Sequence, residues 1–92
     1  MTVFWVSTAE RDRADIIDYI SRDNPLAAIR MDELFAEAAG RLDGNPHLGR
    51  AGLIPGTREL TPHESYRLVY EVRDNTVWIL ALVHTARMWP PR

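Results

Sequence analysis

The chain has no cysteine and no lysine among its 92 residues. Without cysteine it has no disulfide framework, no thiolate metal site and no cysteine nucleophile. No apolar run approaches the roughly 18 residues that cross a bilayer. Residues 1–5 lack the basic flank and small-residue cleavage site of a signal peptide. We therefore expect a soluble cytoplasmic protein with no membrane partner, no metal and no other cofactor.

The charge is distributed unevenly along the chain. All eleven basic residues are arginine, and against thirteen acids they leave a net charge of −2. Residues 1–46 hold five arginines and nine acids (−4), whereas residues 47–92 hold six arginines and four acids (+2). A protein that coats nucleic acid through phosphate charge is normally basic overall. Non-specific coating is therefore not expected, and a local arginine-lined site in the second half is still compatible with the charge.

The first half predicts a strand followed by a helical hairpin. The chain is 46% apolar and 26% charged, ordinary globular composition for one domain over residues 1–92. Residues 2–6 favour a strand. The spacing of Ser7 and Glu10 fits a capping box at the start of a helix. Asn24 and Pro25 predict the N-cap and first turn of a second helix. Helices joined by so short a turn pack antiparallel.

The second half predicts a loop and a small sheet. Residues 44–56 hold four of the five glycines and are expected to form a loop. Residues 57–60, 66–73 and 76–84 have strand composition, and Asp74-Asn75 predicts a tight turn between the last two. The fold class is therefore α+β, with two layers: an N-terminal strand and a helical hairpin packed on a small, mostly antiparallel sheet.

A two-residue turn at 74–75 would set the register of the last two strands. Paired residue numbers would then sum to 149, which places Arg67 and His84 on the face that the helices leave uncovered. The same face would carry an apolar patch that a partner protein could cover. The members of this predicted patch are Val69, Trp78, Leu80 and Leu82.

The candidate chemistry is metal-free RNA cleavage. Such a site needs an acid and a base, a cation on the phosphate and an aromatic ring for a splayed base. Arg67, His84 and Arg87 are the catalytic candidates, and Arg58 and Trp89 the substrate-binding candidates. In the structural alternative, Arg67 merely pairs with Glu71 along the same strand and His84 only ends its strand.

The order of elements resembles the RelE/ParE superfamily of type II toxin–antitoxin toxins. The resemblance spans residues 2–90 and is most distinctive at 56–60 (GTREL), 66–70 (YRLVY) and 83–87 (VHTAR). It implies a cognate antitoxin whose C-terminal segment wraps and blocks the toxin, and we expect this segment to bind the predicted apolar patch. It also places Arg67 on the family's phosphate-contacting arginine, with Arg87 and His84 near two further catalytic positions.

The resemblance leaves the target open. RelE-like members cut mRNA on the ribosome, whereas ParE-like members poison DNA gyrase. The chain lacks the lysines and terminal tyrosine of the best-known nuclease members, while its terminal run resembles the RelE side. We expect growth inhibition by ribosome-dependent mRNA cleavage. The alternatives are a gyrase poison without nuclease activity, acting mainly through residues 89–92, and an inactive relative that only binds the antitoxin.

Overall fold

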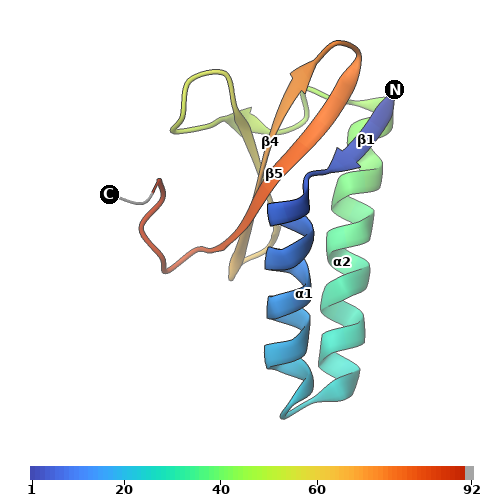
Figure 1. Ribbon diagram of the computed structural model, residues 1–92, viewed down its shortest axis with the longest axis vertical. Helices are drawn as coiled ribbons and strands as arrows, with labels where there is room; N and C mark the ends of the chain where they lie inside the picture. The colour runs from blue at the N-terminus through green and yellow to red at the C-terminus, as the bar shows by residue number, and fades with distance from the viewer. Residues whose placement is uncertain (91–92) are drawn as a thin grey trace.

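The computed structural model describes residues 1–90 as two helices packed on one face of a five-stranded sheet (Figure 1). Residues 91–92, which belong to the 89–92 segment of the gyrase alternative, lie outside the described residues. The elements follow the chain in the order β1 (Thr2–Trp5), α1 (Ser7–Ser21), α2 (Pro25–Gly44), β2 (Arg50–Ala51), β3 (Arg58–His63), β4 (Tyr66–Arg73) and β5 (Thr76–His84). The predicted two-layer α+β fold is confirmed.

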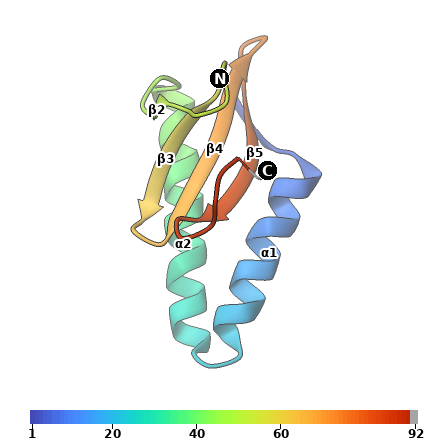
Figure 2. The ribbon, with the colours of Figure 1, turned by 90° about the vertical axis from the view of Figure 1, so that its left-hand side faces the viewer.

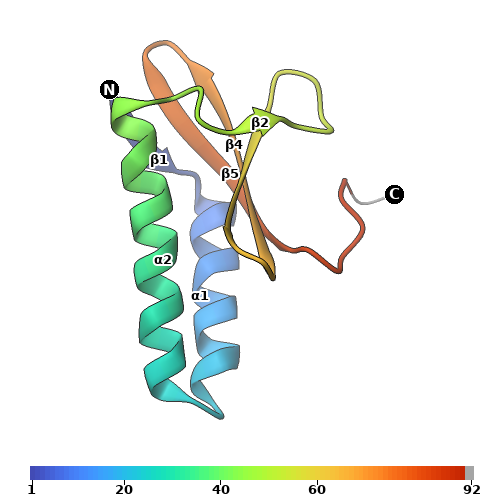
Figure 3. The ribbon, with the colours of Figure 1, turned by 180° about the vertical axis from the view of Figure 1, so that it is seen from behind.

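The strands are arranged in the order β1-β5-β4-β3-β2. All neighbouring strands are antiparallel except β1, an edge strand that pairs parallel with β5. Figure 3 shows α1 and α2 side by side on one side of the sheet, with the C-terminal tail on the other. The sheet thus has a helix face and an open face.

The helical hairpin begins and turns for local reasons. The Asn24 side chain accepts a hydrogen bond from the Ala27 amide (3.1 Å), and Pro25 follows it, as predicted. The predicted capping box at Ser7 is wrong, because the helix already includes Ser7 and its N-cap is Val6, without a side-chain cap. The Val6 amide donates to the Ile79 carbonyl (3.0 Å), so the sheet fixes where α1 starts.

The main core lies between the helices and the sheet. Phe35 and Leu42 of α2 are fully buried against Leu68, Tyr70 and Ile79 of the sheet. A smaller cluster lies on the open face, where Val69, Ala81 and Val83 are buried beneath Trp89 of the tail. Figure 2 looks onto this face and shows the tail crossing in front of β4 and β5. Trp89 thus returns over the open face and covers part of it.

Candidate functional site

A bulge in β5 separates the two central residues of the predicted site. Residue numbers sum to 149 from Arg73↔Thr76 to Tyr70↔Ile79, as expected, and to 150 from Val69↔Ala81 onward. Leu80 is the extra residue. Because side chains alternate along a strand, one inserted residue moves every later side chain to the other face.

The prediction that Arg67 and His84 share one face of the sheet is therefore wrong. His84 lies opposite Tyr66, and Leu82 opposite Leu68, on the helix face. Arg67 lies opposite Val83, which belongs to the open-face cluster. The structure brings His84 to the edge of α1 and leaves Arg67 on the far side of the sheet.

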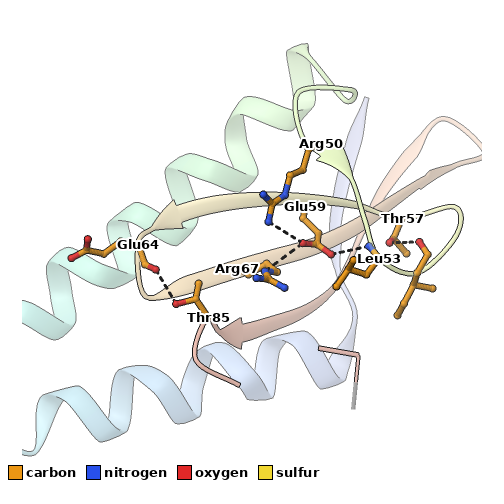
Figure 4. A network of polar contacts seen from close by, with 8 residues as sticks. Arg50, Leu53, Thr57, Glu59, Glu64, Arg67 and Thr85 are labelled. Carbon is orange, nitrogen blue, oxygen red and sulfur yellow. Dashed lines mark hydrogen bonds and ion pairs between the residues drawn. The ribbon is translucent and has the colours of Figure 1, made fainter. Parts of the chain in front are cut away.

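On the open face, Arg67 is paired with a buried carboxylate. Its Nε lies 3.3 Å from Glu59 Oε1, although the angle does not form a hydrogen bond. Only 2% of the Glu59 side chain is exposed, and it also accepts from the Leu53 amide (3.2 Å) and faces Arg50 (3.6 Å), as Figure 4 shows. The pairing of Arg67 along its own strand does not occur, since Glu71 pairs with Arg73 instead.

The predicted apolar patch is largely covered. Val69 is fully buried under Trp89, and Leu82 is 4% exposed on the helix face, so neither belongs to an open patch. Leu80 is half-buried at the bulge. Trp78 is half-buried and meets the 49% exposed Phe4 edge to face, at 5.3 Å between ring centroids. The exposed apolar surface of the open face therefore centres on Phe4 and Trp78.

Arg58 anchors the long loop. Its guanidinium donates to the carbonyl oxygens of Gly49 (2.8 Å) and His47 (3.4 Å). It lies opposite Tyr70 in the β3–β4 pair, away from both Arg67 and His84. Its predicted substrate contact receives no support from neighbouring site residues.

His84 and Arg87 do meet, in a cavity of about 260 Å³ between α1 and the end of β5. The His84 ring packs edge to face on Tyr66, at 5.3 Å between ring centroids. Its Nδ1 accepts from the Ala86 amide (3.0 Å), so the neutral ring carries its proton on Nε2. The cavity is lined by Asp12, Asp15, Ile16, Tyr19, Tyr66, Leu82, His84 and Arg87.

Asp12 is the site residue that the sequence pattern missed. It lies on the face of α1 that amphipathicity assigns to solvent, yet its Oδ2 accepts from the Leu82 amide (3.1 Å), 70 residues away. The pKa of Asp12 is raised above its ordinary value of 3.8, mainly because burial disfavours the charged carboxylate and also because Asp15 lies nearby. The hydrogen bond from Leu82 and the charge of Arg87 oppose this rise. No local signal marks this contact, because β5 supplies it.

Within residues 1–90, no three histidine, aspartate or glutamate side chains come close enough to hold a metal ion. Neither helix in the described part of the chain is long and apolar enough to cross a membrane.

The chain is similar to known toxins over nearly its whole length. Residues 3–89 match the family model described as ParE toxin of type II toxin–antitoxin system, parDE. "Toxin RelE2" of Caulobacter vibrioides is 37% identical over 86 residues, which is 94% of this chain and 97% of that protein. "Putative toxin Y4kP" of Sinorhizobium fredii is 34% identical over 87 residues, 94% of this chain and 90% of the relative.

The fold is also similar to that of solved toxin–antitoxin structures. A chain of the solved structure "Chromosomal ParDE TA system from P. aeruginosa" superposes with a TM-score of 0.81 at 24% identity, covering 91% of this chain and 95% of that chain. At this identity the likeness concerns the fold alone. The fold predicted from the resemblance is confirmed.

Proposed function

Because the chain belongs to the family of ParE toxins of type II toxin–antitoxin systems, we propose that it stops growth by binding DNA gyrase and not by cutting RNA. Gyrase is the target that ParE-like resemblance implies. The observation that supports this choice is the bulge at Leu80, which puts the phosphate-clamp candidate and the acid–base candidate on opposite faces of the sheet.

RNA cleavage requires those two groups to reach one phosphate. A general acid or base acts within hydrogen-bond distance of the reacting oxygen, and the stabilising cation must contact the same phosphorane. Arg67 and His84 have the sheet between them. The Arg67 charge is also balanced by Glu59, whose side chain is 2% exposed. A phosphate would have to compete with that buried carboxylate.

A second candidate is RNA cleavage at the cavity that holds His84 and Arg87. It is favoured by their shared position beside Tyr66 and by the relative named RelE2. Against it stand Asp12 and Asp15, whose negative charges in the same cavity repel a phosphate. The His84 Nε2 also carries the proton in the neutral ring, so it offers the cavity no basic lone pair.

A cognate antitoxin is the second partner in this proposal. We assign its contact to the exposed strip of the open face, Phe4 and Trp78, because a free chain rarely leaves paired aromatic rings in water. Phe4→Ser should weaken antitoxin binding in a pull-down of the co-expressed pair while growth arrest persists. Equal binding by Phe4→Ser and the unaltered chain would move the antitoxin to another surface.

The target is tested by two assays on the same chain. Purified full chain should trap cleaved plasmid in a gyrase reaction, and transcripts from induced cells should show no new 5′ ends in primer extension. Deleting residues 89–92 should abolish the gyrase effect. New 5′ ends at codon boundaries with normal gyrase activity would overturn the proposal in favour of the nuclease.

A matched pair of variants separates the two mechanisms in cells. Arg67→Gln and Arg73→Gln remove guanidinium groups from the same strand and face, and both should retain growth arrest. Loss of arrest with Arg67→Gln alone, in a chain that unfolds at the same urea concentration, would assign Arg67 to a phosphate. Absence of any growth effect from the unaltered chain would reject both mechanisms and identify an inactive relative.

A further inference from the structure

The cavity between α1 and the end of β5 is small. It measures about 260 Å³, below the roughly 300–1,000 Å³ of pockets that hold drug-sized molecules. Figure 1 shows the end of β5 passing beside α1, and the cavity lies where these two elements diverge. Its size suits a single side chain of a partner.

The cavity holds an excess of negative charge. Asp12 and Asp15 lie one helical turn apart on α1, and neither forms an ion pair within residues 1–90. Arg87 also lines the cavity and supplies one positive charge against their two. The aspartates of the cavity thus outnumber its arginine, which favours a cation over an anion.

Tyr66 adds a hydrogen-bonding group to the lining of the cavity. Its side chain belongs to the core and the residue is only 9% exposed, yet its hydroxyl forms no hydrogen bond within residues 1–90. The hydroxyl is not among the fully enclosed unpaired atoms, so a partner can reach it, and Tyr66 is one of the residues that line the cavity. A ligand that donates hydrogen bonds would satisfy it.

Aromatic rings form the remaining walls. Tyr66 and His84 meet edge to face, and Tyr19 stands at the rim with 71% of its surface exposed. Aromatic faces attract cations, most often the planar guanidinium of arginine. An exposed tyrosine at the rim is also typical of surfaces that bind another protein.

We propose that this cavity receives the guanidinium group of an arginine side chain from a partner protein. The carboxylates of Asp12 and Asp15 and the hydroxyl of Tyr66 accept its N–H groups, and the rings of Tyr66 and Tyr19 contact its planar face. Guanidinium offers five donors in a rigid fork, which matches several acceptors better than a lysine ammonium does. Arg87 is then the internal competitor of the incoming group. The proposal does not depend on which target the toxin inhibits.

The test uses the full chain, freed of antitoxin, and a small probe. The probe is Nα-acetyl-arginine methylamide, with the matched citrulline derivative as its neutral control. Binding is followed by NMR shifts of the backbone amides near Asp12, Leu82 and His84. The arginine probe should give saturable shifts with a dissociation constant on the order of millimolar, because one side chain makes few contacts. The citrulline probe should give none.

Two variants must act in opposite directions. Asp15→Asn should weaken the arginine probe about three- to fivefold, as for loss of one partly exposed charge partner. Arg87→Gln should tighten the binding of the arginine probe, because it removes the competitor. Asp18→Asn is the matched control, since Asp18 lies on the same helix and pairs with Arg22 away from this cavity; it should change nothing.

Inorganic phosphate tests the alternative that the cavity binds an anion. If Arg87 and His84 formed an anion site, phosphate would shift the same amides and Arg87→Gln would abolish that binding. That result would overturn the proposal, as would equal shifts from the citrulline and arginine probes. Tyr66→Phe should weaken binding of the arginine probe without changing the urea midpoint of unfolding. Unchanged binding would show that the Tyr66 hydroxyl does not contact the guanidinium group.

Discussion

The hydroxyl of Tyr70 ties the long loop to the sheet, and Tyr70→Phe should reveal its worth. Tyr70 is fully buried in the core. Its hydroxyl accepts from the Gly49 amide (2.8 Å) and donates to the Pro46 carbonyl (2.8 Å). Phenylalanine keeps the ring and its packing, so the change removes these two hydrogen bonds and nothing else.

The expected cost follows from the groups left behind. Gly49 is buried and its amide would lose its acceptor, which costs about 1–3 kcal/mol. The half-buried Pro46 carbonyl would lose a donor at a smaller cost. We expect the free energy of unfolding to fall by about 2–4 kcal/mol. For a chain of this size, that lowers the melting temperature by about 10–20 °C.

Urea unfolding followed by tryptophan fluorescence measures this cost, and Tyr66→Phe is the matched control. Both residues lie on β4 and face the helices, but the Tyr66 hydroxyl has no hydrogen bond within residues 1–90. The control should change the free energy of unfolding by less than about 0.5 kcal/mol. Equal effects of the two substitutions would refute the reasoning, because the Tyr70 hydrogen bonds would then add nothing to stability.

Three further predictions concern pH, the half-buried carboxylate of Asp12 and two glycines. Burial raises the pKa of Tyr70 above its ordinary value of 10.0, so the unfolded chain loses this proton at a lower pH than the folded state. The free energy of unfolding should therefore be steady below about pH 10 and fall above it. It should fall less steeply in Tyr70→Phe, which has no hydroxyl at this position. Burial also raises the pKa of Asp12, so the folded state favours the protonated carboxyl. The free energy of unfolding that this adds is present below pH 3.8 and is lost as the pH rises through the folded pKa. In urea unfolding at pH 7, Asp12→Asn should therefore match or exceed the unaltered chain, whereas Asp12→Ala, which leaves the Leu82 amide without an acceptor, should lose about 1 kcal/mol. Gly40→Ala, at an exposed position of α2, should stabilise the helix by about 0.5–1 kcal/mol. Gly49→Ala should destabilise the chain, because its Cβ would lie 2.8 Å from the Tyr70 hydroxyl. A higher urea midpoint for Gly49→Ala than for Gly40→Ala would contradict both.

Local chemistry fixed the helical hairpin and the tight turn. Asn24 caps α2 and Pro25 starts it, interactions that need no distant partner. Asp74 and Asn75 both adopt positive φ (53° and 58°), the conformation that a two-residue hairpin turn demands. Both features were predicted because the residues that form them are neighbours in the sequence.

The candidate site escaped prediction because β5 gives no mark of its own register. Residues 77–83 are apolar at every position, so no alternation of polar and apolar side chains indicates which face each one takes. The extra residue, Leu80, could therefore not be located from the pattern. Likewise, the place of Asp12 depends on a strand 70 residues away.

The sequence by itself determined the elements, their order and the turns between them, since these depend on short-range propensity and capping. Only the tertiary structure decided which side chains share a surface. The bulge in β5 sends His84 to the helix face, and Arg67 lies with Glu59 on the other face. Faces are set by long-range register, which neighbouring residues do not encode.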